Sequence, residues 1–291
     1  MCGERLDRSK TIFFVRFVIF VIFACVLAAT PAAAQTFSVG VEDARDRFTY
    51  HFENPSAFDT PQLVPHFFEQ TYVADNLWLV AALRYTAGLP WETSGAVTLR
   101  RALPATDYDT FFDPDGTVIV SGTKGDAEIS SLRVGQRAEL GRSGRLAFVA
   151  GYTVRYDRAH FLVGHKSVSR NGRIVEAFDV TTPEMTSSLI QEFFVGAKLG
   201  RDVGSGWKMT IGGEAAPTTT GRLAIELPEK YPGQQFVFVA TSLTGTARLT
   251  LSRAPNRRPI ELSIDAAHAW RYSSENALTR ERFSARLTVG L

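Results

Sequence analysis

The chain has 291 residues, with 32 basic and 30 acidic side chains and a formal charge of +2. This near equality of basic and acidic residues excludes a general nucleic-acid binder, which would carry a basic excess. Its two cysteines, Cys2 and Cys25, both fall in the first 25 residues, so the rest of the chain cannot form a disulfide. Hydrogen bonding and packing must hold that remainder together.

The N-terminus has the pattern of a secretory signal. Four basic residues precede or begin an apolar stretch at 17–29, and Ala32 and Ala34 then fit the small-x-small cleavage rule. We predict a cleaved signal peptide over 1–34 and a single domain over 35–291. Beyond residue 34 no apolar run approaches the ~20 residues of a spanning helix, so a membrane-embedded form of this domain must be a β-barrel.

Alternation of apolar and polar residues dominates the remainder. In "RFSARLTVGL" (282–291) every second residue from Phe283 to Leu291 is apolar, and "RLAFVAGYTVRYD" (145–157) repeats the pattern. The alternating segments exceed the ~5 or 6 residues of a typical sandwich strand and match the length that membrane barrels need. The pattern predicts a transmembrane, antiparallel, up-and-down β-barrel.

The turn pattern gives the strand number. Short connections ("AGLP", "GRSG", "DVGSG", "APNRRP") alternate with longer ones at 54–65, 105–126, 161–184, 227–234 and 274–279. An even strand number with short periplasmic turns and longer extracellular loops is typical of outer-membrane barrels. We predict about ten strands, with eight and twelve as alternatives, near 38–53, 66–86, 91–104, 127–141, 145–160, 185–200, 207–226, 235–253, 260–273 and 280–291.

Acidic residues cluster in "ATDYDTFFDPDGTV" (105–118), on the predicted second extracellular loop. "DPDG" favours a β-turn, because proline sets φ and glycine tolerates the left-handed region. A calcium loop is the weaker interpretation: an EF-hand register would place Phe111 first and Gly122 last, where that motif has Asp and Glu. Two carboxylates at Asp107 and Asp109 leave a third interpretation, one half of a hydrolytic centre.

The order "LVPHFFEQTY…LWLVAALRY…DYDTFF…LAFVAGYTVRYD…QEFFVGAKLG" resembles the omptin family of ten-stranded outer-membrane endopeptidases. Over roughly residues 66 to 245 this resemblance implies a barrel with an active site at its extracellular mouth. The family's D-x-D motif corresponds to Asp107 and Asp109, which are therefore the candidate catalytic residues.

The other half of the family's site, a D-x-H pair on the fourth loop, is not matched. The corresponding stretch is "ELPEKYPGQ", where Pro228 and Lys230 take the places of the aspartate and the histidine, and Glu229 lies between them. A protonated lysine cannot accept a proton from water. We therefore interpret Glu229 and Lys230 as a candidate binding pair that opposes the acidic pair.

Other histidines are weak replacements. His160 and His165 fall near the third loop, and His51 and His66 flank the first. His268 alternates with lipid-facing residues and is predicted in the interface belt. No catalytic-serine, phosphate-loop or zinc motif is present, and we predict no cofactor and no metal.

Charged residues also fall on the predicted inner face of the barrel. Because a ten-stranded barrel is narrow, such residues are expected to fill it with ion pairs. A solute path is the alternative. The predicted inward set is Arg133, Arg137, Glu139, Arg155, Glu192, Lys198, Arg248, Asp265 and Arg286.

These observations favour an outer-membrane protein of omptin-like architecture that is non-catalytic and uses its surface loops to bind a ligand, lipid or partner. An endopeptidase using Asp107 and Asp109 with a remodelled fourth loop is the alternative, and a narrow channel is the third. The expected location is the outer membrane of a Gram-negative-type envelope. Expected partners are outer-membrane lipid, with lipopolysaccharide as a candidate, and the barrel assembly machinery, but no nucleic acid.

Overall fold

The computed structural model describes residues 35–53, 67–85, 90–98, 102–112, 115–143, 145–180, 184–226, 233, 235–253, 258–271 and 276–291. No helix within these ranges is long and apolar enough to cross a membrane.

Twelve strands account for nearly all of the described residues: β1 (Gln35–Glu53), β2 (Phe67–Tyr85), β3 (Trp91–Thr98), β4 (Ala102–Phe112), β5 (Val118–Ser143), β6 (Leu146–Arg170), β7 (Arg173–Val180), β8 (Glu184–Gly204), β9 (Trp207–Glu226), β10 (Phe236–Arg253), β11 (Ile260–Arg271) and β12 (Asn276–Gly290).

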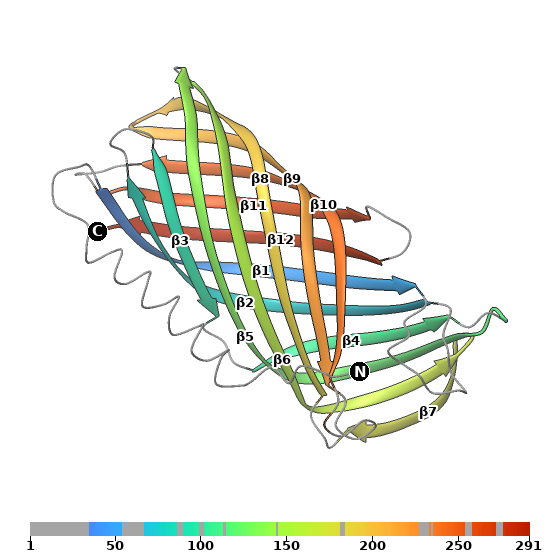
Figure 1. Cartoon of the computed structure of the whole chain (residues 1–291). Coiled ribbons are helices and arrows are strands. Elements are labelled where there is room, and N and C mark those ends of the chain that lie inside the picture. The colour runs from blue at the N-terminus through green and yellow to red at the C-terminus, as the bar shows by residue number, and fades with distance from the viewer. Residues whose placement is uncertain are drawn as a thin grey trace.

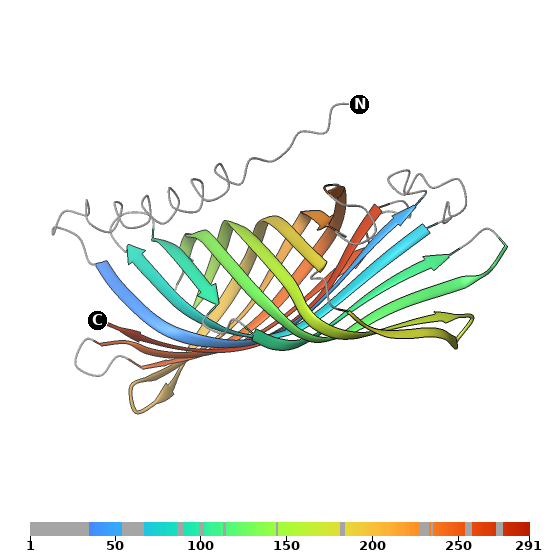
Figure 2. The same ribbon diagram turned by 90° about the horizontal axis from the view of Figure 1, so that it is seen from below.

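Ten strand positions form a closed antiparallel ring (Figures 1 and 2). The first and last strands close it, with pairing from Ser38↔Gly290 to Phe52↔Asn276. β3 and β4 share one position, since both pair with β2 and with β5. The predicted barrel of about ten strands is therefore confirmed.

The strands begin and end close to the predicted positions on the short-turn side. β8 and β9 are joined by a two-residue turn in which Ser205 and Gly206 have φ values of 52° and 75°, the left-handed region that tight hairpins require. Ser38 of β1 and Gly290 of β12, which pair where the ring closes, lie at the same end of the barrel as this turn. In an outer-membrane barrel this is the periplasmic end.

Apolar side chains cover the outside of the barrel near that end. On β12 the exposed residues include Phe283, Leu287 and Val289, while Ser284 between them is buried. On β1 the apolar outer residues stop at Val41, because Asp43 follows on the same face. A tilted strand needs about 9–11 residues to cross a membrane. β12 has 15 residues and β5 has 26, so these strands continue past the apolar band.

The aromatic pair Tyr85 and Trp91 lies at the periplasmic edge of this band, with ring centroids 5.9 Å apart. Outer-membrane barrels carry a girdle of aromatic residues at this position. Near the other edge, His268 contacts the ring of Trp270 at 4.8 Å. Its neighbours Leu262 and Ile264 are exposed on the same outer face. His268 thus lies on the outer face, and its position in an interface belt stays a prediction.

A bulge in β9 changes which residues face inward. The pairing of β9 with β10 slips between Ser242↔Thr219 and Thr244↔Ala216, which places an extra residue near Pro217. Proline cannot donate to the strand ladder, so it is found at such irregularities. As a result, the inward face of β9 carries even-numbered residues before the bulge and odd-numbered residues after it.

Candidate functional site

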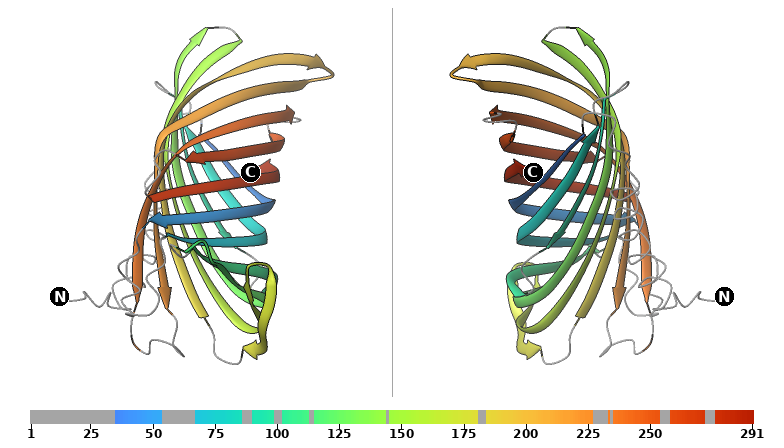
Figure 3. Two further views of the ribbon diagram at one scale, coloured as in Figure 1. Left: turned by 90° about the vertical axis from the view of Figure 1, so that its right-hand side faces the viewer. Right: turned by 90° about the vertical axis from the view of Figure 1, so that its left-hand side faces the viewer.

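One part of the sheet extends beyond the other strands at the extracellular end. We call it the extracellular wall: β4, residues 118–126 of β5, residues 162–170 of β6, and β7. These segments gather at the lower right of Figure 1, and Figure 3 shows the β6–β7 hairpin from two sides. β7 pairs only with β6 and is the free edge of the described sheet.

The wall corrects two predictions. Residues 105–126 and 161–184 were expected to be loops, but most of them are strands. "ATDYDTFF" reads as a loop because of its aspartates, yet its backbone is paired on both sides, with β2 and with β5. The missed β6–β7 hairpin has an Asn171-Gly172 turn with φ values of 49° and 78°. An Asn-Gly pair between β-branched runs is a strong hairpin signal and would have found it.

The candidate catalytic residues therefore lie on a strand, not on a loop. Asp107 pairs in register with Tyr72 and Thr123, and Asp109 pairs with Gln70 and Ser121. The opposing candidates, Glu229 and Lys230, lie outside the described residues. The structure does not test the predicted contact between the two halves.

None of the described candidate histidines, His51, His160 and His165, shares a register row with the acidic pair, and His66 lies outside the described residues. His160 pairs with Glu128 and with Met185. His165 pairs with Lys124 and with Asp179, and its Nδ1 lies 3.2 Å from Asp179 Oδ1. His51 Nδ1 lies 2.8 Å from Glu69 Oε1 on the neighbouring strand. Each of the last two imidazoles thus has a carboxylate of its own.

The tip of the wall joins two turns. The backbone N–H of Val118 donates to Asn171 Oδ1 at 2.9 Å, and the N–H of Asn171 donates to the Val118 carbonyl at 2.8 Å. Next to them the N–H of Thr117 donates to Asp115 Oδ1 at 2.8 Å, which lowers the pKa of Asp115. Asp115 thus serves the turn, as "DPDG" predicts. The described residues hold no group of three or more His, Cys, Asp or Glu that would bind a metal.

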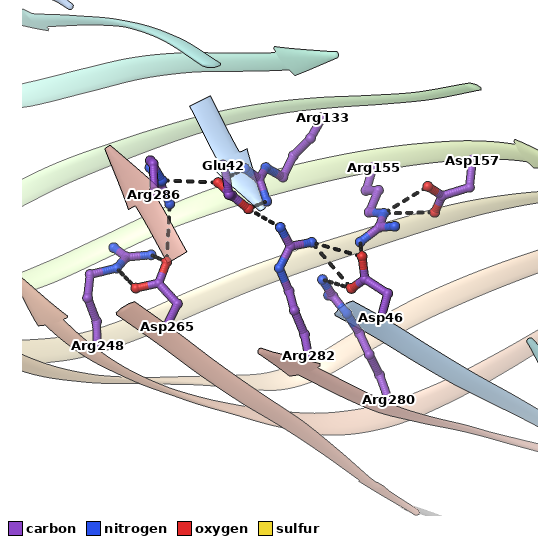
Figure 4. Close-up of polar contacts among 10 residues, drawn as sticks. All are labelled: Glu42, Asp46, Arg133, Arg155, Asp157, Arg248, Asp265, Arg280, Arg282 and Arg286. Carbon is purple, nitrogen blue, oxygen red and sulfur yellow. Dashed lines mark hydrogen bonds and ion pairs between the residues drawn. The ribbon is translucent and has the colours of Figure 1, made fainter. Parts of the chain in front are cut away.

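Inside the barrel, buried carboxylates bind several guanidiniums at once (Figure 4). Glu42, which is fully buried, forms ion pairs with Arg133 at 2.7 Å, with Arg286 at 3.0 Å and with Arg282. Asp46 faces inward further along the same strand, β1, and is also fully buried. It forms ion pairs with Arg155 at 2.9 Å and with Arg282 at 3.4 Å.

The ion pairs continue around the ring. Arg155 also binds Asp157 at 2.8 Å, and Arg280 binds Glu192 at 3.2 Å. Closer to the periplasm, the remaining pairs are Arg248–Asp265, Arg286–Asp265, Arg137–Glu214, Lys198–Glu139 and Arg84–Glu92. A buried charge is tolerated only when it is paired, so this mutual pairing is what allows so many charges in one narrow lumen.

The ion-paired residues of the lumen form what we call the charged layer. Aromatic rings pack into it. The guanidiniums of Arg155, Arg133 and Arg282 lie 5.0, 5.2 and 5.7 Å from the ring centroid of Trp78, which is fully buried. Arg155 also lies 4.9 Å from the ring of Phe48. Cation–π contacts of this kind gain strength where water is excluded.

Above the charged layer, toward the extracellular end, the lumen is filled by apolar side chains. Phe52 stacks on Phe238 with centroids 4.4 Å apart, and Tyr50 donates to or accepts from Ser188 Oγ at 2.9 Å. We call this set the apolar layer; it comprises Phe48, Tyr50, Phe52, Ile190, Leu223, Ile225, Phe238, Ala240 and Leu278.

All nine residues predicted to face inward do so and form ion pairs. Sequence reasoning missed the two carboxylates at the centre, Glu42 and Asp46, and it missed Glu214 and Arg280. Alternation marks all four as inward. Which of them meet depends on how β1 closes against β12.

A closed antiparallel ring with an apolar outer band, a charged lumen and short turns at one end defines an outer-membrane β-barrel. Comparison with solved structures agrees. The outer membrane protease OmpT from Escherichia coli superposes with a TM-score of 0.64 at 8% identity, covering 90% of this chain and 96% of that one. The distant omptin-like resemblance is thus shown, and at this identity it shows the fold alone.

Other matches are weaker. The β domain of the Bordetella autotransporter BrkA gives a TM-score of 0.35 at 9% identity, covering 87% of this chain and 98% of that one. The COG4313 outer membrane channel from Pseudomonas putida F1 gives 0.33 at 11% identity, with coverages of 90% and 97%. No family model matches the sequence, and no curated protein matches it.

Proposed function

We propose that this protein is a non-catalytic outer-membrane barrel that binds an extended segment of a partner protein at its extracellular wall. The observation that carries the proposal is the contrast between a filled lumen and a free sheet edge. The charged layer and the apolar layer together occupy the lumen, which argues against a solute path. The wall, by contrast, offers a strand, β7, that has one unpaired side within the described part of the chain.

The edge strand β7 supports the choice of ligand. An exposed strand presents a row of backbone N–H and C=O groups to which an extended peptide adds as a further strand. Two neighbouring apolar side chains on β7, Ile174 and Val175, are 69% and 63% exposed. Val175 is the extra residue of a β-bulge, because Val168 pairs with Glu176 and Ser169 pairs with Ile174. An added strand would meet both apolar side chains at this point of the edge.

An endopeptidase remains the second candidate, because Asp107 and Asp109 lie two positions apart on β4, within the wall. A catalytic carboxylate pair would still need a base to activate water. The register gives neither His51 nor His165 to the pair, and position 230 is a lysine. These features favour binding over cleavage.

One experiment separates the two functions. The refolded barrel is incubated with a mixed library of unstructured peptides, and both retention on the barrel and cleavage are read by mass spectrometry. The informative variant replaces residues 165–179 by Asn-Gly, joining the register partners Gly164 and Val180 with a two-residue turn.

We expect retention without cleavage, and loss of retention when the β6–β7 hairpin is shortened. Asp107→Asn and Asp109→Asn should leave retention unchanged. Cleavage that these two substitutions abolish would overturn the non-catalytic proposal and establish the endopeptidase. Equal retention by the shortened variant would overturn the role of β7.

A further inference from the structure

Two cavities lie in the periplasmic half of the lumen, below the apolar layer. The periplasmic vestibule, of about 330 Å³, lies among Pro90, Arg145, Lys208 and Ser252 near the short turns. The central cavity, of about 140 Å³, lies deeper and is bounded by residues that include Arg155, Arg280 and Ala267. The cavities are adjacent, because Arg137, Arg248, Arg286 and Glu92 line both.

Positive charge exceeds negative charge around these cavities. Eleven cationic side chains line them, against nine carboxylates when the paired Glu42, Asp46 and Asp157 are included, an excess of two. Two cations of the vestibule, Arg145 and Lys208, form no ion pair within the described part of the chain. A low-dielectric wall that carries one sign of excess charge concentrates counter-ions of the other sign.

Two arginines that line the central cavity carry buried hydrogen-bond donors without acceptors. Arg155 Nη2 and Arg280 Nε are buried and have no hydrogen-bond partner, and the two residues are 2% and 6% exposed. None of the described lumen carboxylates has a buried oxygen without a donor. Among the charged groups of the lumen the imbalance is therefore one of surplus donors, which an acceptor-only ligand would correct.

The positions of the two arginines indicate the shape of that ligand. Arg155 is on β6 and Arg280 is on β12, which are five steps apart in a ring of ten positions. Their guanidiniums reach in from opposite sides of the lumen and both contact Asp46, at 2.9 and 3.8 Å. A tetrahedral oxyanion offers acceptor oxygens in all directions, and guanidiniums bind phosphate oxygens strongly. The central cavity exceeds the ~30 Å³ that one water occupies in the liquid.

We propose that the lumen is a blind anion-binding site, which takes one tetrahedral oxyanion of the size of phosphate from the periplasm. The vestibule attracts the anion, and the surplus donors of Arg155 and Arg280 hold it in the central cavity. The charged and apolar layers close the path above. The site thus binds without transporting, and it lies at the opposite end of the molecule from the wall.

The test is calorimetric titration of the folded barrel in detergent with inorganic phosphate at constant ionic strength. Ala267→Leu fills the central cavity without changing any charge, and its control is Ala266→Leu, the next residue on β11, which is exposed on the outside. The double variant Arg145→Gln and Lys208→Gln removes the vestibule's unpaired cations. Its control is Arg201→Gln. Arg201 is an exposed cation whose register partner is the outward-facing Met209, and it does not line the vestibule.

We expect saturable binding of about one phosphate per barrel, no measurable binding to Ala267→Leu, and binding about three- to tenfold weaker in the double variant at low salt. Both controls should stay within about twofold of the unmodified barrel. Heat-modified mobility on gels verifies that each variant is folded. No saturable binding by the unmodified barrel would mean that water alone fills the cavity and would overturn the proposal. Unchanged binding to folded Ala267→Leu would also overturn it, since the anion would then bind elsewhere.

Discussion

The lumen and the extracellular wall belong to one continuous sheet, yet their charged residues are in opposite situations. In the lumen, Arg155 and Asp46 are almost fully buried and each contacts more than one opposite charge. On the wall, the His165–Asp179 pair is 63% and 85% exposed. Exposed pairs contribute little to stability, whereas breaking a buried pair leaves an uncompensated charge. The comparison teaches that stability resides in the lumen and that the wall is free to change.

The largest effect is expected at the centre of the lumen. Asp46→Asn removes a buried negative charge that Arg155, Arg280 and Arg282 contact. We expect a loss of about 3–5 kcal/mol, measured by urea unfolding of the refolded barrel in detergent. Asp43→Asn, on the outer face of the same strand, should cost less than about 0.5 kcal/mol. Similar losses for both variants would break the comparison.

A somewhat smaller effect is expected in the apolar layer. Phe52→Ala removes a ring that is 2% exposed and stacked on Phe238, so it leaves a cavity. We expect a loss of about 3 kcal/mol in the same unfolding assay. Phe283→Ala, on the outer face where lipid or detergent fills the space, should cost less. A larger loss for Phe283→Ala would show that the apolar layer does not stabilise the barrel.

The wall should tolerate removal of its hairpin. When Asn-Gly replaces residues 165–179, the ring of ten strand positions keeps its pairings below the wall. Besides the β6–β7 pairing, only the β5–β6 rows from Ile119↔Arg170 to Lys124↔His165 are lost. We expect the free energy of unfolding to change by less than about 1 kcal/mol, and the gel mobility to stay heat-modifiable. A barrel that no longer refolds would mean that the wall is part of the folding unit.

The smallest effect is expected for a charge pair on the outside of the same strands. Arg45 and Asp75 lie 3.9 Å apart with side chains 72% and 66% exposed. Arg45→Ala should therefore change stability by less than about 0.5 kcal/mol. A loss as large as that of Asp46→Asn would contradict the account, because burial and not charge alone sets the difference.

The sequence predicted most of the barrel because alternation is a local signal. The starts of β9 at Trp207 and of β11 at Ile260 follow from the first apolar residue after each short turn. The wall was missed for a local reason too: aspartates at 107 and 109 resemble turn chemistry, but long-range pairing with β2 and β5 overrides that preference.

The lumen was predicted only in part, because its contacts are set by ring closure. Glu42 and Arg282 are 240 positions apart, and they meet only when β1 pairs with β12 in the observed register. A slip of one residue would move each to the opposite face. The bulge near Pro217 has the same consequence on β9, where it decides which residues form the apolar layer. Alternation identifies the inward face of a strand but not the partner that faces it.

The central claim, that paired charges and apolar side chains close the lumen, is tested most directly by current recordings in a planar bilayer. Both the unmodified barrel and the variant with the shortened hairpin are inserted and held at 100 mV, about 2.3 kcal/mol per elementary charge. The account predicts a flat baseline for both proteins. Reproducible current steps from the unmodified barrel would contradict it.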